Sequence, residues 1–304
     1  MYRLTIGIPT YQRPMMLEKL LQSIFSSIID TSLFSYIDIV VVDNDAERTA
    51  ETIIARWINR HPDSFFHLHY FNYPIKGLAN VRNEILKRAL HLAPDYIAFI
   101  DDDEYACPEW MNELTRTIVN NQADIAVGPV LPVFEQETSP AISSAFYFFR
   151  YNDQEAIDFM YSGNVIMRAR FLIDQQLIFD ARFNTLGAED TFFGVTALKK
   201  GAKIFWSNKA VAYEVVPEKR AKLSWLIKRK FRLANTYMYI LLIEKKYGKI
   251  IKKVLVSFFY LFVGALALIL TPIRIKHRFF GVLKIAESLG ALAKLFNIKY
   301  QEYL

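Results

Sequence analysis

The sequence predicts an α/β protein: a mostly parallel sheet with helices on both faces over residues 1–220, followed by a helical tail over residues 221–304. Three observations predict it. Short apolar segments alternate with amphipathic ones through the first half, acidic side chains follow two of the apolar segments, and the composition becomes basic and apolar after Ser224. Hydrophobic residues make up 53% of the 304 residues and charged residues 22%, which excludes a disordered chain.

The first 130 residues alternate strand and helix signals. Leu17, Leu20, Leu21, Ile24, Phe25 and Ile28 fall on one helical face, whereas the strand segments are short and apolar. Strands alternating with helices of this length imply parallel strands joined by crossovers. The predicted strands are 4–8, 37–42, 66–70, 96–100 and 124–130, and the predicted helices are one ending near Ile28, one over 46–60, one from Gly77 and one from Pro108.

After Pro132 the pattern is less regular. Residues 133–160 show no clear period and include the aromatic stretch 146–149, which suggests a cover over a site. Beyond it we expect a strand at 164–167, short and longer helices at 168–175 and 189–200, and strands at 203–206 and 211–215. The turn of Ser162, Gly163 and Asn164 lies at the edge of the predicted sheet, where it could contact a second substrate, the acceptor.

Three consecutive carboxylates, Asp101, Asp102 and Asp103, follow the apolar segment 96–100. Three such charges at the end of a buried strand repel one another unless a cation or hydrogen-bond donors neutralise them. Hard oxygen ligands suit Mg²⁺ or Mn²⁺, which often share their coordination with substrate phosphates. Ligands also bind at the carboxyl ends of strands in open α/β sheets. The triplet therefore predicts a metal–diphosphate site, with a solvated acidic turn as the alternative.

The tail mixes basic and apolar residues. Residues 254–270 run without a charge, close to the ~20 residues that span a bilayer, so a short span, a re-entrant hairpin or an interfacial helix are all compatible. Basic residues on both flanks argue against a simple span. With the amphipathic segment 286–296, they favour a module that associates with anionic headgroups at a membrane surface. A buried helical hairpin is the alternative.

The net charge and the cysteine count indicate which partners and which cellular compartment suit this chain. The net charge is +6, with basic residues concentrated at 199–232 and 245–278, which suits nucleic acid, anionic lipid or a phosphorylated acceptor. The apolar run favours lipid over nucleic acid. Cys107 is the single cysteine, so no internal disulfide forms and a reducing compartment fits. Residues 1–4 lead straight into a strand, and we expect no secretory signal.

Five fragments occur in an order that resembles the family 2 glycosyltransferases. This family has the GT-A fold, and its members are inverting and use nucleotide sugars. The resemblance covers about residues 3–232, and the tail lies outside it. The fragments are IPTYQRP at 8–14, VVDND at 41–45, KGLANVRN at 76–83, DDD at 101–103 and GAED at 187–190.

The resemblance implies roles for individual residues. Asp101 and Asp103 would be the metal pair, with Asp103 binding the cation directly and Asp101 and Asp102 contacting ribose, sugar or metal-bound water. Asp190 would be the base that takes the acceptor proton, and Glu189 would orient the acceptor or sugar. The other nucleotide-sugar contacts would come from Pro9, Thr10, Tyr11, Arg13, Asp43, Asn44 and Arg82, with Asp43 on the uridine base and Arg82 on a phosphate or base edge.

We therefore expect a hexosyl- or hexosaminyltransferase that uses a divalent cation, Mn²⁺ or Mg²⁺. It would lie at the cytoplasmic face of the inner membrane, either peripherally or with one short membrane segment. Its donor would be a nucleotide sugar, most simply UDP-linked, and its acceptor a glycan on a polyisoprenoid lipid, in surface polysaccharide or lipopolysaccharide biosynthesis. Two alternatives remain: a non-catalytic nucleotide-sugar-binding module and a basic nucleic-acid-binding protein. The uncharged run at 254–270 fits the second poorly.

Overall fold

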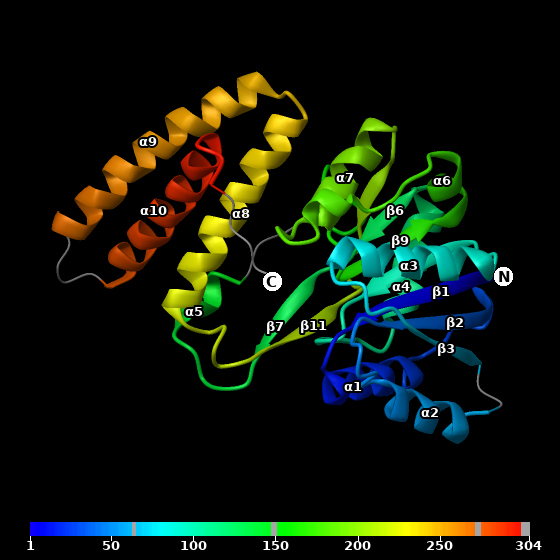
Figure 1. Cartoon of the computed structure of the whole chain (residues 1–304). Coiled ribbons are helices and arrows are strands. Elements are labelled where there is room, and N and C mark those ends of the chain that lie inside the picture. Colours follow the sequence, from blue (N-terminus) through cyan, green and yellow to red (C-terminus); the bar gives the residue numbers. More distant parts are fainter. Residues whose placement is uncertain (63–64, 147–150, 271–274, 299–304) are drawn as a thin grey trace. The chain divides into compact units, whose positions relative to one another are not determined.

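The computed structural model describes residues 1–62, 65–146, 151–270 and 275–298 (Figure 1). The chain forms two compact units. Unit 1 comprises Met1–Val133, Phe149–Asn184 and Glu189–Val215, and unit 2 comprises Phe134–Phe148, Thr185–Ala188 and Val216–Leu304. The chain therefore passes between the units several times before the tail begins.

Unit 1 is built on an eight-stranded sheet with the order β3-β2-β1-β4-β9-β6-β10-β8. The first four strands are parallel, as the alternation of strands and helices predicts. The other half is mixed, because β9 runs antiparallel between β4 and β6, and β8 runs antiparallel to β10. The strands are β1 (Tyr2–Thr10), β2 (Phe34–Asp43), β3 (Phe66–Asn72), β4 (Tyr96–Ile100), β6 (Ile125–Val127), β8 (Ala156–Ile157), β9 (Asn164–Arg168) and β10 (Ile204–Trp206).

Helices cover both faces of this sheet, and strands such as β2, β4 and β9 supply side chains to both cores. In β2, Ile39 and Val41 pack into one core and Val40 and Val42 into the other, as the two-residue period of a strand requires. One core contains residues of α1 (Pro14–Phe25), α2 (Glu51–Arg60) and α4 (Trp110–Asn120). The opposite core contains residues of α3 (Leu78–His91), α6 (Ala169–Asp174) and α7 (Glu189–Lys199), and the 3₁₀ turn Ala181–Phe183 precedes α7.

Three predicted boundaries are wrong. Helix α1 ends at Phe25, and Ile28 lies beyond it with 59% of its surface exposed. Helix α2 begins at Glu51 rather than near residue 46, because Asp43 and Asp45 accept hydrogen bonds from the backbone of residues 45–50. The predicted strand 124–130 is two strands, since β6 ends at Val127 and β7 (Val130–Phe134) joins a second sheet with β5 (Glu104–Ala106) and β11 (Ala212–Val216).

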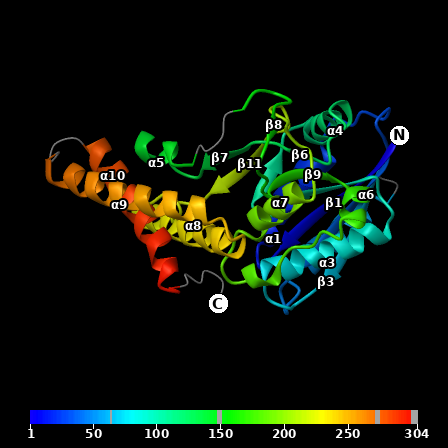
Figure 2. The same ribbon diagram turned by 90° about the horizontal axis from the view of Figure 1, so that it is seen from above.

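Unit 2 contains the short helix α5 (Pro140–Ser144) and three long helices, α8 (Leu223–Ile243), α9 (Tyr247–Leu270) and α10 (Ile275–Leu295). The long helices lie side by side in both ribbon views (Figure 2). Residues Tyr247–Leu268 of α9 are long and apolar enough to cross a membrane, and only 17% of the 18-residue window that meets this criterion is buried. A buried hairpin, one alternative for this segment, does not fit that exposure.

The aromatic stretch expected to cover the site lies largely outside the described residues, at 147–150. Of its described neighbours, Phe146 stacks on Trp225 within unit 2, with ring centroids 5.8 Å apart. Tyr151 packs against Phe159 and Trp206 within unit 1.

Candidate active site

The aspartate triplet stands at the carboxyl end of β4, in the centre of the sheet of unit 1. The fully buried segment Tyr96–Ile100 fixes the chain up to that point. Asp102 is buried, whereas the side chains of Asp101 and Asp103 keep 33% and 12% of their surface exposed. Burial raises the pKa of Asp101 above its ordinary value. The charge of Arg82 lowers that pKa and the charge of Asp103 raises it further, so it stays raised. The triplet is therefore a set of partly desolvated, mutually repelling carboxylates.

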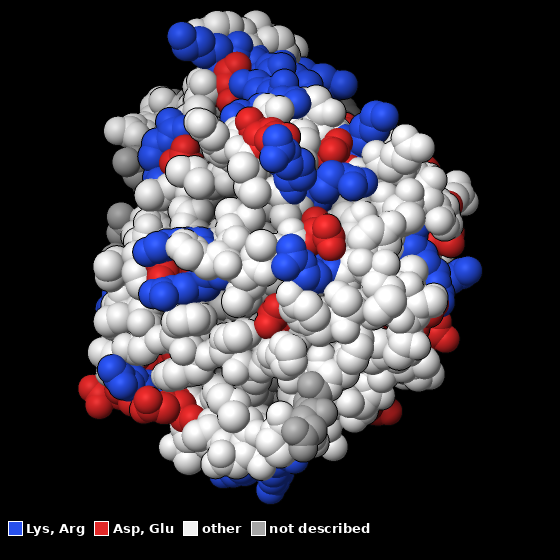
Figure 3. Space-filling view, turned by 90° about the vertical axis from the view of Figure 1, so that its right-hand side faces the viewer, with Lys and Arg blue, Asp and Glu red and all other residues white. Residues whose placement is uncertain are grey.

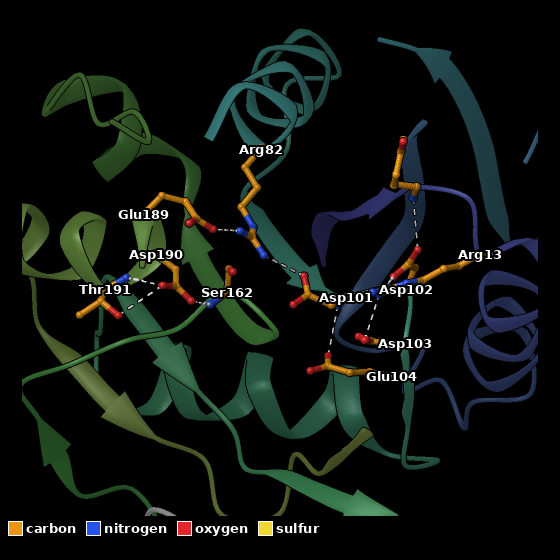
Figure 4. A network of polar contacts seen from close by, with 11 residues as sticks. Arg13, Arg82, Asp101, Asp102, Asp103, Glu104, Ser162, Glu189, Asp190 and Thr191 are labelled. Carbon is orange, nitrogen blue, oxygen red and sulfur yellow. Dashed lines mark hydrogen bonds and ion pairs between the residues drawn. The ribbon is translucent and has the colours of Figure 1, made fainter. Parts of the chain in front are cut away.

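The loop after β1 neutralises two of these carboxylates (Figure 4). One guanidinium nitrogen of Arg13 donates to Asp102 Oδ1 at 2.9 Å and to Asp103 Oδ2 at 3.0 Å. Thr10 Oγ1 donates to Asp102 Oδ2 at 2.9 Å, and the Tyr11 backbone N–H reaches the same oxygen at 3.4 Å. Burial would lower the pKa of Arg13, but Asp102 and Asp103 outweigh it and leave that pKa raised. The structure thus brings Thr10, Tyr11 and Arg13 together with the triplet.

Arg82 connects the triplet to the second acidic motif. In Figure 4 its side chain leaves α3 and lies between Glu189 and Asp101. One terminal nitrogen donates to Asp101 Oδ1 at 2.9 Å, and the other forms an ion pair with Glu189 Oε1. Arg82 and Glu189 are both buried, at 4% and 2% exposure, and the Arg82 Nε and Glu189 Oε2 atoms have no hydrogen-bond partner among the described residues. Burial raises the pKa of Glu189 to about 7, although Arg82 opposes the shift.

Asp190 differs from its neighbour in being half-buried and free of a cation contact among the described hydrogen bonds and ion pairs. Its Oδ1 accepts the Thr191 backbone N–H at 2.6 Å, and its Oδ2 accepts the Ser162 backbone N–H at 3.3 Å. These donors come from α7 and from the turn before β9, so two elements fix the carboxylate. Within the acidic pair, Asp190 is the accessible carboxylate and Glu189 the buried, paired one.

The residues at the end of β2 have internal partners. Asp43 is completely buried, and its carboxylate accepts hydrogen bonds from the Asp45 and Ala50 backbone and from the Tyr70 hydroxyl. Asn44 donates from its side chain to the Tyr73 and Ile75 carbonyls at 2.6 and 2.8 Å. Both side chains therefore hold the loops after β2 and β3, and any contact with a base would compete with these bonds.

Pro9 and Tyr11 flank Thr10 at the end of β1. Pro9 is buried and lies opposite Val42 in the parallel β1–β2 pair. Tyr11 is outside the sheet with 47% of its surface exposed, so its ring is available to a ligand. Gln12 follows in a left-handed conformation, with φ of 53°, and its amide donates to Asp45. The chain turns sharply here, which brings Arg13 back towards the triplet.

Comparison with known proteins decides the family. A sequence model described as "Glycosyl transferase family 2" matches residues 5–176, more than half of the chain. The chain belongs to glycosyl transferase family 2. The succinoglycan biosynthesis protein ExoM of Rhizobium meliloti is 30% identical over 248 residues, which cover 80% of this chain and 76% of that protein. The glycosyltransferase GlyA of Streptococcus pneumoniae is 30% identical over 146 residues, 48% of this chain and 18% of that one.

Solved structures share the fold of this family 2 glycosyltransferase. The crystal structure of S. aureus TarS 1-349 has a TM-score of 0.57 at 16% identity, covering 98% of this chain and 93% of that one. The mannosyltransferase PcManGT from Pyrobaculum calidifontis, in complex with GDP-Man and Mn²⁺, has a TM-score of 0.64 at 15% identity, covering 98% and 88%. The predicted GT-A fold is therefore confirmed.

Glu104 lies directly beside the triplet, and the sequence alone did not single it out. It is buried directly after the triplet, and its Oε2 accepts the Asp101 backbone N–H at 3.2 Å. Burial, with repulsion from Asp101, Asp103 and Glu214, raises its pKa well above the ordinary value. Gly163 makes the room for it, because a Cβ at position 163 would come within 2.5 Å of Glu104 Oε1. The signal available in the sequence was the glycine in the turn before β9.

The carboxylate oxygens of the triplet fit the coordination of a divalent cation only in part. Asp101 and Asp103 supply hard carboxylate oxygens at one strand end, which Mg²⁺ and Mn²⁺ prefer. Among the described residues no group of three or more His, Cys, Asp or Glu side chains could hold a metal ion by itself. That matches a cation bound through one or two carboxylates and completed by substrate phosphates, rather than a site made of protein ligands alone.

Proposed function

We propose that this glycosyltransferase moves a hexosyl or hexosaminyl group from a UDP-sugar to a hydroxyl of a glycan acceptor, with inversion at the anomeric carbon. The observation that carries the proposal is Arg82, which joins Asp101 of the triplet to Glu189 of the acidic pair. A diphosphate at the triplet would then lie beside a carboxylate that can receive an acceptor proton. TarS has been solved in complex with UDP-GlcNAc, which supports a UDP-linked donor on this fold.

Asp190 is the base in this proposal. As the acceptor oxygen attacks the anomeric carbon, its proton passes to the Asp190 carboxylate, and the bond from that carbon to the diphosphate oxygen breaks with its electron pair. Two backbone N–H groups hold the carboxylate in place, so it need not reorganise during the reaction. Glu189 cannot take this role without breaking its buried ion pair with Arg82.

The triplet holds the diphosphate end of the donor. Asp101 and Asp103 would bind a divalent cation that offsets the negative charge developing on the departing diphosphate. Arg13 fixes Asp102 and Asp103 in position, and with 40% of its side chain exposed it can also face a phosphate. The mannosyltransferase solved with GDP-Man and Mn²⁺ supports a cation-assisted donor site on this fold.

For the acceptor we propose a glycan carried on a polyisoprenoid diphosphate lipid at the cytoplasmic face of the inner membrane. The relative ExoM is a succinoglycan biosynthesis protein, which supports a role in surface polysaccharide assembly. The exposed apolar stretch of α9 supports a membrane location.

The test is a screen of nucleotide sugars for thermal stabilisation, with and without Mn²⁺, followed by a transfer assay with the selected donor. A donor present at 100 times its Kd should stabilise the folded protein by about 2.7 kcal/mol. We expect Asp103→Ala to lose the Mn²⁺-dependent part of the stabilisation and the transfer. Asp174→Ala, on an exposed aspartate of α6 that pairs only with Arg170 among the described contacts, is the control. Normal turnover in Asp103→Ala would refute the metal role.

The transfer assay and a salt titration of nucleic-acid binding separate the alternatives. A non-catalytic module would bind the donor without turning it over. A nucleic-acid-binding protein would show affinity that falls steeply with salt. The molecule offers that alternative little support on the face shown in Figure 3, where positive and negative side chains are interspersed.

A further inference from the structure

Helix α9 exposes a continuous stripe of large apolar side chains, which we call the α9 stripe. Apart from the adjacent Phe258 and Phe259, its members are spaced three or four residues apart, so they share one face of the helix. Each exposes between 37% and 66% of its surface. A contiguous apolar surface of this length is costly in water and marks a binding surface. The stripe consists of Tyr247, Ile251, Leu255, Phe258, Phe259, Phe262 and Leu266.

The opposite face of α9 is already covered by α10. Gly264 packs so closely that a Cβ there would come within 2.7 Å of Ile285, and Lys253 pairs with Glu287 at 2.7 Å. Residue 253 thus meets 287 while 264 meets 281 and 285, so the two helices run antiparallel. Any immersion of α9 along its whole length would carry α10 with it.

The charges on α10 exclude such immersion. Glu287 accepts from Lys253 and from Lys284, at 2.7 and 3.0 Å, in a half-buried cluster between the helices. Burial lowers the pKa of Lys230 on α8, and the negative charge of Glu287 partly offsets this by raising it. Lys284 of this cluster also lies 4.8 Å from the ring centroid of Tyr260, in the middle of α9. A spanning α9 would place that ammonium group in the hydrocarbon, where ionised side chains are costly. A transmembrane orientation of α9 therefore conflicts with its own partner helix, and only the stripe is free to enter lipid.

Exposed lysines stand at the same end of the helix as the start of the stripe. Lys245 and Lys246 end the α8–α9 turn, and Lys249 and Lys252 lie in the first two turns of α9. All four are exposed. Lysines beside an apolar face are attracted to anionic headgroups, and the long side chains can reach the interface. This charge complementarity selects an anionic lipid surface, rather than a second copy of the chain, as the occupant of the stripe.

We propose that α9 lies flat in the headgroup region of an anionic bilayer, with the α9 stripe inserted in one leaflet and α10 on the side away from the lipid. The protein is then monotopic, bound on one face of the membrane without crossing it. The inference rests on the proposed function for its purpose, which is access to a lipid-linked acceptor. Its test contains no nucleotide sugar, so lipid binding and transfer can fail independently.

The first experiment measures cosedimentation of the full chain with phosphatidylglycerol and phosphatidylcholine vesicles. We expect binding to phosphatidylglycerol vesicles that weakens with salt. The double variant Leu255→Glu, Phe262→Glu should bind phosphatidylglycerol vesicles more weakly by roughly 100-fold or more, because each buried apolar side chain contributes about tenfold to the affinity. The matched control replaces Ile173 and Ile178, exposed apolar residues of unit 1, with Glu and should bind as the wild type does. Equal loss in both variants would overturn the proposal.

The second experiment measures depth. In a Cys107→Ser background, single cysteines at positions 251, 258 and 266 carry an environment-sensitive fluorophore, and lipids with nitroxides at different depths quench it. A flat helix gives the same shallow depth at all three positions. A spanning helix separates positions 251 and 266 by about 22 Å in depth, at 1.5 Å per residue. A graded profile overturns the flat orientation. Sedimentation velocity tests the alternative that the stripe binds a second copy of the chain. If the wild type is a dimer that binds no vesicles, and the Leu255→Glu, Phe262→Glu variant is a monomer, the claim that lipid covers the stripe is refuted.

Discussion

The Arg82→Met substitution tests whether the Arg82 guanidinium stabilises the ionised carboxylates of Asp101 and Glu189 in the folded protein. The substitution keeps most of the side-chain volume but removes the single guanidinium that contacts both Asp101 and Glu189. Glu189 is buried and Asp101 half-buried, so both carboxylates would lose their cation without gaining water. Breaking a buried ion pair by removing one partner costs about 3–5 kcal/mol, mainly because the remaining charge stays buried. We expect a loss of that size in the free energy of unfolding at pH 8.

The loss should depend on pH in a defined direction. Burial raises the pKa of Glu189 to about 7 and also raises that of Asp101, and Arg82 opposes both shifts. In Arg82→Met the opposition is gone, so the folded protein holds protons that the unfolded chain releases at about pH 4. A raised carboxyl pKa in the folded state gives stability that is present at low pH and is lost as the pH rises through that pKa. The penalty should therefore shrink between pH 8 and pH 5.5.

Urea unfolding followed by circular dichroism measures both effects. The control is Arg170→Met in α6, which breaks an exposed ion pair with Asp174 at 2.8 Å and should cost no more than about 1 kcal/mol at either pH. The reasoning is refuted if Arg82→Met costs as little as the control at pH 8, or if its cost is the same at both pH values.

Two further predictions address the proposed base and the tail. Asp190→Asn should lower the transfer rate by about 10²–10⁴-fold while leaving donor binding and stability close to wild type, and it should remove the acidic limb of the pH–rate profile; a retained limb would contradict the assignment. Gly290→Ala should destabilise the packing of α10 on α8, because the added Cβ would meet the Phe231 carbonyl oxygen at 2.1 Å, and a thermal melt unchanged from wild type would contradict that packing. Gly248→Ala is its control, because no described atom beyond the neighbouring residues and backbone of its own helix lies within 4 Å of the added carbon.

The parts of the fold that follow from local periodicity were predictable. Alternation in β2 places Ile39 and Val40 in opposite cores, and the apolar segment 96–100 ends at the triplet as expected. The antiparallel course of β9 was not predictable, because residues 133–160 carry no period from which its direction could be inferred. The same holds for the break at Gly128 and Pro129, where an apolar segment leaves one sheet and joins another.

The candidate site shows a similar division. The residue types and their positions at strand ends and at the start of a helix were visible in the sequence, but their pairing was not. Arg82 and Glu189 are 107 positions apart, and only the packed structure shows that one guanidinium serves both acidic motifs. The internal hydrogen bonds of Asp43, from the Asp45 and Ala50 backbone and from the Tyr70 hydroxyl, were not predictable from its position at the end of β2. Its contact with a uridine base stays a prediction.

The charge balance of the site is the strongest physical argument for a cation in the proposed reaction. In the described part of the site, the carboxylates of Asp101, Asp102, Asp103 and Asp190 outnumber the guanidinium groups of Arg13 and Arg82. This holds even when Glu104 and Glu189, whose pKa values are raised, are left out of the count. A nucleotide diphosphate carries further negative charge and would be repelled by this surface on its own. A divalent cation between Asp101, Asp103 and the diphosphate would reverse the sign of that interaction. Donor affinity should therefore depend on the cation far more than the stability of the free protein does.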